Sequence, residues 1–274
     1  MGLYSELNKI NTLTGSSMVF LNIGQGDSIL IKSRGLFGLI DAGPGQVVSE
    51  RIDEYIPYNM DVLDFVILTH FDQDHIEGFL RIAKNYKINK LFIIKSSKDN
   101  FLIKEINKTI LENKIATYYL NEDNDFQLGD FKFNVLWPNM YSYENIQESN
   151  DLSIALEISD DKCNVYTAGD LSSSFESKTS NSILDNYMEV LKLGHHGSRT
   201  STSLEFLSQI KPQIGIISAS KDNRYGHPHS KVLDNLKQNN VKSLLTFDGN
   251  IELKFLSDQI ELRQSVFTYK ILCF

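Results

Sequence analysis

The sequence predicts an α/β fold in which two packed sheets carry helices on their outer faces. Two observations predict it. Apolar runs rich in β-branched and aromatic residues alternate with stretches of helical period along most of the 274 residues. This succession occurs twice without an exact repeat, which indicates two layered sheets rather than two separate domains. We therefore expect one domain over residues 1–274, and five prolines are too few for long linkers.

In the N-terminal half, the apolar pattern predicts strands first and then alternating helices and strands. Three runs separated by turn residues are typical of consecutive antiparallel strands, at residues 18–23, 27–33 and 35–43. A helix and then a buried strand are expected at residues 47–56 and 63–70. Helix, strand, helix and strand follow at residues 75–86, 90–96, 100–114 and 116–120. A hairpin is expected at residues 126–138.

The C-terminal half begins again with strands. Two are expected at residues 151–159 and 164–170, followed by a polar stretch that we interpret as helical. Further strands are expected at residues 189–197 and 213–220, and they alternate with helices at residues 201–210 and 231–240. Terminal strands complete the chain.

Composition bounds the class of protein. The net charge of −8 provides no general basic field, so nucleic acid would have to meet a local patch or bound metal ions. No apolar stretch is long enough to span a bilayer, and the first residues do not resemble a secretory leader, so we expect a cytoplasmic protein without membrane contact. Cys163 and Cys273 lie far apart in the sequence, which favours two core thiols in a reducing compartment over a disulfide.

All six histidines fall in three short stretches, THFDQDH, LGHHGS and YGHPHS. Each stretch follows an apolar run, as does Asp170 in VYTAGD, so several strand ends can bring ligands to one edge of the sheets. Imidazole nitrogen and carboxylate oxygen are ligands of borderline and hard divalent ions. Two ions about 3.5 to 4 Å apart need about this many side chains, including a carboxylate that bridges them. The sequence therefore predicts a metal site with two ions.

Each of these stretches also admits a structural interpretation. Asp72 and Asp74 could cap the following helix, HHGS could be a turn at Gly197 with Ser198 as a cap, and GHPH could be a loop at Pro228. A Ser-His-Asp triad at HHGS is conceivable, although no G-x-S-x-G elbow occurs. The glycines of NIGQGD lie between two strands without a following helix and lysine, so we reject a nucleotide-binding loop there. The density of histidine and aspartate in THFDQDH favours metal binding over capping.

Seven segments, in this order, resemble metallo-β-lactamase-fold hydrolases, and most of all the soluble hydrolase domain of the DNA-uptake protein ComEC. They are NIGQGDSILI, LIDAGPG, LTHFDQDHIEGF, NDLSIALEI, TAGD, LKLGHHGS and NRYGHPH, between about Met18 and Phe247. The resemblance implies a four-layer αββα sandwich with a metal site at one edge of the two sheets. It does not extend to the membrane channel of ComEC, so a free-standing chain need not take up DNA.

The resemblance also implies roles for individual residues. The metal ligands would be His70 and Asp72 for one ion, Asp74 and His75 for the other, Asp170 as the bridge and His196 as a further ligand. His195 would lie near the scissile group. His227 would contact the substrate or complete the site.

Two departures from the superfamily pattern H-x-H-x-D-H bear on the choice of metal. Asp72 stands where the second histidine is expected. No histidine occurs between His75 and His195, so Asn150 or Asp151 would serve in that interval. An oxygen-rich site of this kind makes Mn²⁺ a candidate beside Zn²⁺.

The leading hypothesis is a hydrolase with two divalent metal ions, Mn²⁺ or Zn²⁺, that cleaves phosphodiester bonds, with DNA as the expected substrate. Asp74 and Asp170 would hold the nucleophile, and His195 or His227 would offer a proton or a hydrogen bond. Substrate contacts are expected from Asn150, Ser198, Arg224 and His227.

Lys192, Arg199 and Arg224 flank the later motifs and would add local positive charge, unless all three are solvated surface residues. Two other functions stay open from the sequence. One is a hydrolase of small phosphoesters or other esters, because one fold hosts many chemistries. The other is a binding or signalling module that has kept the fold without catalysis.

Overall fold

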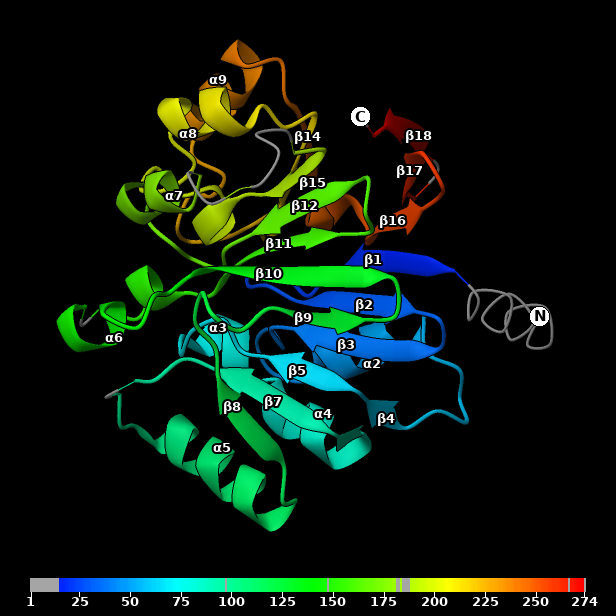
Figure 1. The fold of residues 1–274 in the computed structure, drawn as a ribbon, viewed down its shortest axis with the longest axis vertical. Helices are drawn as coiled ribbons and strands as arrows, with labels where there is room; N and C mark the ends of the chain where they lie inside the picture. Colours follow the sequence, from blue (N-terminus) through cyan, green and yellow to red (C-terminus); the bar gives the residue numbers. More distant parts are fainter. Residues whose placement is uncertain are drawn as a thin grey trace.

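The computed structural model describes residues 15–96, 98–146, 148–180, 183, 188–265 and 267–273. In this part of the chain, two large sheets lie at the centre and helices cover both outer faces, with α8 and α9 at one end of the view and α4 and α5 at the other (Figure 1). The predicted four-layer αββα sandwich is therefore confirmed. No helix in the same residues is both long and apolar enough to cross a membrane.

The first sheet has nine strands within the described residues, in the order β18-β17-β16-β1-β2-β3-β5-β7-β8. They are β1 (Ser16–Phe20), β2 (Ile29–Ser33), β3 (Leu36–Ile40), β5 (Phe65–Ile67), β7 (Lys90–Ile93), β8 (Ala116–Tyr119), β16 (Ile251–Phe255), β17 (Gln259–Gln264) and β18 (Phe267–Leu272). Pairing is antiparallel from β18 to β3 and parallel from β3 to β8.

The second sheet has seven strands in the same described part, in the order β15-β14-β13-β12-β11-β10-β9. They are β9 (Phe126–Leu128), β10 (Phe131–Trp137), β11 (Ala155–Ser159), β12 (Asn164–Thr167), β13 (Val190–Lys192), β14 (Ile214–Ile217) and β15 (Lys242–Leu245). Pairing is antiparallel from β9 to β12 and parallel from β12 to β15. A small parallel pair is formed by β4 (Val62–Leu63) and β6 (Lys87–Ile88).

The α-helices are mostly short. Within the described residues they are α2 (Val47–Asp53), α3 (Gln73–Ile76), α4 (Phe79–Asn85), α5 (Phe101–Glu112), α6 (Ser142–Asn145), α7 (Ser173–Thr179), α8 (Leu204–Ile210) and α9 (Ser230–Gln238). Within the described residues, single turns of 3₁₀-helix occur at η2 (Asn150–Leu152) and η5 (Thr246–Asp248), whereas η4 (Gly194–Gly197) is a turn in which His195 and His196 have left-handed backbone angles. The polar stretch predicted to be helical is α7 in its first part, and most of residues 181–187 lies outside the described residues.

The helix predicted over residues 75–86 is divided in the structure. Helix α3 ends at Ile76 and α4 begins at Phe79. Gly78 lies at the division, where its N–H donates to the carbonyl of Gly43 (2.9 Å) and a Cβ would stand 2.1 Å from the carbonyl oxygen of Ala42. This close approach between backbones packs the start of α4 onto the loop after β3, which a local periodicity does not reveal.

In the described part of the chain, three hydrophobic clusters fill the spaces between the four layers. One lies between the sheets and contains Met18 and Phe20 of β1, with Phe131 and Phe133 of β10. Val19, between the two inward residues of β1, belongs instead to the cluster under the helices of the first sheet. A third cluster lies under α7, α8 and α9 on the second sheet. Successive side chains of a strand point to opposite faces, so a sheet covered on both sides requires continuous apolar runs.

The expectation of two free core thiols is wrong, because Cys163 and Cys273 form a disulfide. Cys163 lies in the turn between β11 and β12, and Cys273 follows β18, so the bond ties the edge strand of the first sheet to the second sheet. The Cα atoms are 5.1 Å apart although 110 residues separate the cysteines in sequence. A disulfide does not fit the reducing compartment inferred from the sequence, so that argument for a cytoplasmic location is withdrawn.

The parallel strands of both sheets direct their carboxyl ends to one edge of the sandwich. In the first sheet, β5 leads there to His70. In the second sheet, β12 leads to Asp170, and β13 leads to His195 and His196. The loops after these strands therefore place the histidine-rich stretches next to one another. This edge holds the candidate functional site.

Candidate metal centre

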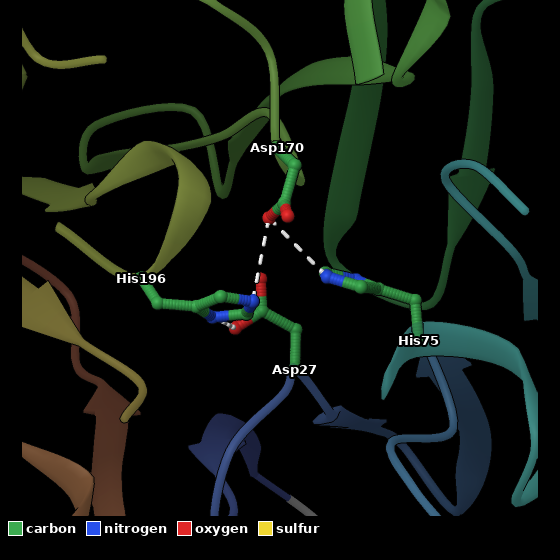
Figure 2. A group of neighbouring side chains, drawn as sticks. All are labelled: Asp27, His75, Asp170 and His196. Atoms are coloured by element: carbon green, nitrogen blue, oxygen red, sulfur yellow. Dashed lines mark ion pairs between the residues drawn. The ribbon is translucent and has the colours of Figure 1, made fainter. Parts of the chain in front are cut away.

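Four buried side chains from distant parts of the sequence form a compact cluster at this edge (Figure 2). Asp27 precedes β2, His75 lies in α3, Asp170 follows β12 and His196 lies in η4. One ligand atom from each lies within 4.8 Å of the others. Asp170 Oδ1 is 3.2 Å from His75 Nε2 and 3.6 Å from His196 Nε2. Asp170 therefore stands at the centre of the cluster.

The free polar atoms of this region indicate what it binds. Five buried atoms have no hydrogen-bond partner among the described residues, namely Asp27 Oδ1, His70 Nε2, His75 Nε2, Asp170 Oδ1 and His196 Nε2. An unsatisfied buried polar atom costs roughly 1 to 3 kcal/mol, so the fold does not retain several in one place without compensation. Their donor types, imidazole nitrogen and carboxylate oxygen, are those that bind divalent ions. The residues present therefore fit a divalent metal.

A second layer of contacts orients the histidine rings. The Nδ1 atom of His75 lies 2.8 Å from Asp41 Oδ2, and that of His70 lies 3.0 Å from Thr69 Oγ1. Asp41 also accepts hydrogen bonds from the backbone and the side chain of Thr69, both at 2.7 Å. His196 Nδ1 lies 3.0 Å from the carbonyl oxygen of Ser218. Because Nδ1 is engaged in each ring, Nε2 is the nitrogen available to a metal.

Asp27 was not identified from the sequence as a site residue. Its Oδ2 forms an ion pair of 2.6 Å with Lys192 Nζ, while its Oδ1 lies 3.5 Å from His196 Nδ1. The sequence signal was the NIGQGD segment, which belongs to the family resemblance but carries neither histidine nor a recognisable ligand spacing. Gly26 is needed there, since its φ is +123° and a Cβ would stand 2.2 Å from the carbonyl oxygen of Asp74.

Lys192 is neither a free positive charge beside the later motifs nor a solvated surface residue, the two alternatives that the sequence left open. It is fully buried, and besides Asp27 its ammonium donates to the carbonyl of Leu193 (2.8 Å). It is therefore not a solvated surface residue. Its charge is matched inside the protein by the carboxylate of Asp27.

The two histidines of HHGS face different surroundings because of an unusual backbone. His195 and His196 have φ values of 48° and 56°, and Gly197 follows at 79°. The left-handed region costs a residue with a Cβ roughly 1 to 2 kcal/mol, so the surrounding structure must enforce this turn. His196 points inward, with Nε2 3.3 Å from Asp74 Oδ2. His195 remains at the open side, one third exposed, with Nε2 3.5 Å from Asp170 Oδ2.

The structure places the two aspartates of HFDQDH differently. Asp74 reaches the cluster through His196, whereas the carboxylate of Asp72 forms an ion pair with Lys98. Asp72 is also the N-cap residue of α3, but its side chain accepts no hydrogen bond from the helix. Asn150 begins η2, a turn held beside this loop because Phe71 N donates to Ser149 Oγ (3.2 Å). Whether Asp72 or Asn150 binds metal or substrate remains a prediction.

The remaining residues expected at the site are His227, Arg224 and Ser198. The ring of His227 lies 5.7 Å from that of His195, centre to centre, and its buried Nδ1 has no partner among the described residues. Arg224 is exposed and donates to the hydroxyl of Tyr225 (2.7 Å). Ser198 is buried, and its hydroxyl lies 3.0 Å from that of Thr200. His227 is thus the residue of this group that the structure brings to the histidine cluster.

Electrostatics favour ionised carboxylates at the centre. Burial disfavours the charged form of Asp170, but His196 and His75 outweigh burial and hold its pKa well below the usual range. Burial also opposes the charged form of His196, yet Asp170 and Asp27 raise its pKa to about 9. For His70, burial and the neighbouring His75 lower the pKa to about 4. A metal that binds here must displace protons from imidazole, so its affinity should fall at low pH.

Comparison with known proteins agrees with this architecture. A model of the beta-lactamase superfamily domain matches residues 38–181, more than half of the chain. The chain belongs to the beta-lactamase superfamily. Superfamily members with the metallo-β-lactamase fold are mostly metal-dependent hydrolases, and the candidate metal cluster of this member fits that chemistry.

Two curated relatives and one solved structure illustrate the similarity of this superfamily member to known proteins. It is 30% identical to ComE operon protein 3 of Bacillus subtilis (strain 168), over 86% of the chain and 32% of that protein. It is 27% identical to competence protein ComA of Neisseria gonorrhoeae, over 81% of the chain and 30% of that protein. The chain thus spans about a third of the length of these relatives. The metallo-β-lactamase fold protein YhfI from Bacillus subtilis aligns with a TM-score of 0.58 at 14% identity, over 93% of the chain and 99% of YhfI.

Proposed function

We propose that the protein is a phosphodiesterase that uses two divalent metal ions and acts on DNA. The two carboxylate oxygens of Asp170 carry this proposal. Oδ1 faces His75 and His196 at 3.2 and 3.6 Å, whereas Oδ2 faces His195 and His70 at 3.5 and 3.8 Å. A carboxylate whose two oxygens face two separate pairs of histidines is suited to bridge two ions.

The side chains around Asp170 divide accordingly. Asp27, Asp74, His75 and His196 would hold one ion. His70 would hold the other, with Asp72 if its carboxylate turns from Lys98 toward it. When bound, two divalent ions supply a water nucleophile of lowered pKa and stabilise the charge that develops on the leaving oxygen. Either Mn²⁺ or Zn²⁺ is compatible with this mixture of nitrogen and oxygen donors.

The residues on the open side would act on the substrate. His195 is partly exposed and lies beside both Asp170 and His227, which supports a role in which it would give a proton to the leaving oxygen. His227 would donate a hydrogen bond to a phosphate oxygen. Asp41 acts through His75, whose ring it orients, and is therefore a positioning residue.

DNA is proposed as the substrate from the similarity to competence proteins together with the phosphodiester chemistry of such centres. The test is to load the purified protein with Mn²⁺ or Zn²⁺ and offer single-stranded DNA, duplex DNA, RNA and an aryl phosphodiester. Cleavage of DNA that a chelator abolishes supports the proposal. Turnover of the aryl phosphodiester or of small phosphoesters without any cleavage of polynucleotides favours the small-ester hydrolase instead, and absence of bound metal favours a non-catalytic module.

Asp170→Asn is the decisive variant, because an amide cannot bridge two cations as a carboxylate does. Turnover should fall by about two orders of magnitude or more, an estimate from loss of the activated water. Asp161→Asn is a matched control, since Asp161 is an exposed aspartate in the turn between β11 and β12 that pairs with Lys132. If Asp170→Asn retains activity while folded, the bridging role is refuted.

A further inference from the structure

Two groups of aromatic and cationic side chains lie at the edge of the sandwich that carries the candidate metal centre. We name them the first flank, formed by Lys95, Tyr119 and Tyr143, and the second flank, formed by Arg224 and Tyr225. Lys95 follows β7, Tyr119 ends β8, and Arg224 and Tyr225 follow β14, all at the carboxyl ends of parallel strands and so at the edge that also carries the histidines. Tyr143 joins the first flank from α6. Neither the metal centre nor the proposed function assigns a role to the tyrosines of either flank.

The first flank continues the edge of the first sheet. Strands β7 and β8 are parallel to β5, so Lys95 and Tyr119 lie at the edge where β5 leads to His70. The ammonium of Lys95 lies 5.9 Å from the ring centre of Tyr119 and 5.7 Å from that of Tyr143. Tyr119 is 52% exposed, so its ring is accessible to a ligand. The loop that carries Lys95 is linked to the metal-binding segment by the ion pair between Lys98 and Asp72.

The second flank lies beyond β14 and is held firmly in place. The side chain of Asn223 bonds to the carbonyls of Ser220 and His227 and accepts from the N–H groups of Tyr225 and His227. Tyr225 is 54% exposed, and its ring stacks on that of His227, with centres 5.8 Å apart and planes 25° from parallel. The guanidinium of Arg224 lies against the same tyrosine, 4.9 Å from its ring centre.

The charges of both flanks remain available to an anionic ligand. Among the described residues, no carboxylate lies within ion-pair distance of Lys95 or Arg224, whose charged groups contact tyrosines instead. The protein as a whole has a net charge of −8, so a polyanion must be bound through such local cations. Alternating aromatic rings and cations suit a strand of nucleotides, because rings stack on bases while cations meet phosphates.

We propose that the two flanks bind one single-stranded polynucleotide that passes over the metal centre, with bases stacked on Tyr119 on one side and on Tyr225 on the other. This inference rests on the proposed function. It narrows the substrate to a strand with nucleotides on both sides of the bond that is cleaved. Bases paired within a duplex are already stacked and do not offer free faces to tyrosine, so the single strand is the form recognised.

Binding of a labelled oligothymidylate of about twelve nucleotides, followed by fluorescence anisotropy, tests the inference. The measurement is made with chelator to prevent cleavage, and repeated on the metal-loaded protein with a phosphorothioate-linked strand. Tyr119→Ala and Tyr225→Ala should each raise Kd about fivefold or more, and the double variant should approach the product of the two effects. Tyr119→Phe and Tyr225→Phe keep the rings and should bind as the wild type does.

Tyr58→Ala provides the matched control, because Tyr58 is 87% exposed and precedes β4 at another part of the fold. Its Kd should stay within about twofold of the wild-type value, which is the usual range for a surface change away from the ligand. A ribo-oligonucleotide, a duplex of the same sequence and a dinucleotide are run in parallel. Tight binding of either single strand, with weaker binding of the duplex and the dinucleotide, supports the inference.

The outcomes separate this inference from the proposed function. If metal-loaded protein cleaves DNA but the alanine variants bind the strand as the wild type does, the flanks are not the binding surface and the inference fails alone. If the strand binds through both tyrosines but no metal supports its cleavage, the proposed function fails and the binding surface stands. Failure of the wild type to bind any single strand, or preference for the duplex, overturns the inference.

Discussion

The buried ion pair between Lys192 and Asp27 offers a direct test of how the metal centre is built. Lys192 is fully buried and Asp27 nearly so, with 2.6 Å between Nζ and Oδ2. Lys192→Met removes the positive charge and keeps most of the apolar stem. It leaves the Asp27 carboxylate buried with His196 as its remaining charged contact. We expect the free energy of unfolding of the metal-free protein to fall by about 3 to 5 kcal/mol, the usual cost of removing one partner of a buried pair.

Two further changes should restore part of the stability that Lys192→Met loses. Adding Asp27→Asn to Lys192→Met removes the unpaired charge, so the double variant should lose clearly less stability than the sum of the single variants. Metal should also stabilise Lys192→Met more than it stabilises the wild type, because a divalent cation replaces the missing positive charge next to Asp27. The second expectation holds only if Asp27 faces the metal.

Urea unfolding followed by the fluorescence of Trp137, the single tryptophan, measures these differences, since this residue is buried in the folded protein. Lys32→Met is the matched control. Lys32 is a buried lysine paired with Glu252 at 3.4 Å in the first sheet, away from the metal centre. Lys32→Met should lower the free energy of unfolding, and metal should stabilise this variant no more than it stabilises the wild type. Additive effects of Lys192→Met and Asp27→Asn, or equal gains from metal in both lysine variants, would refute the reasoning.

Three further predictions concern single residues. Burial raises the pKa of Glu176 from 4.5 to about 8, so between these pH values the folded state keeps a proton that the unfolded state releases. The free energy of unfolding should therefore fall by up to about 1.4 kcal/mol per pH unit as the pH rises from 4.5 to 8. Glu176→Gln should remove that slope in urea unfolding, and an unchanged slope would assign it to another group. His196→Ala should lower metal content measured by elemental analysis, whereas His195→Ala should keep metal and slow turnover; loss of metal in His195→Ala would reverse the two assignments. Asp72→His should raise Zn²⁺ retention and lower the ratio of Mn²⁺- to Zn²⁺-supported turnover at equal occupancy, and no change would leave Asp72 as the partner of Lys98.

The layered fold could be predicted from the sequence because both faces of each sheet are covered. Continuous apolar runs such as residues 63–70 and 213–220 are required by neighbours on both sides, and this requirement is visible locally. The division of the helix expected over residues 75–86 was not predictable in this way. It depends on the approach of Gly78 to the carbonyl of Ala42, a contact that exists only in the folded chain.

The gathering of histidines was also predictable, because parallel strands bring their carboxyl ends to one edge and each histidine stretch follows a strand. Which of the two histidine rings of HHGS faces inward could not be predicted from the sequence. The left-handed turn at HHGS turns His196 into the centre and leaves His195 at the open side, and the enforcing contacts come from other segments.

By itself, the sequence determined the two packed sheets with helices outside, the edge that carries the site and the donor types gathered there, because these follow from side-chain period and from the position of each histidine stretch after a strand. Only the tertiary structure decided the pairings across long separations. Asp27 meets Lys192 over 165 residues and Cys163 meets Cys273 over 110. Such pairs have no local signature, since an ionisable side chain or a thiol has the same sequence neighbours whether its partner is water or another part of the fold. Lys192, for which a solvated surface position was one of the two expectations, is buried, and the cysteines expected to be free are bonded.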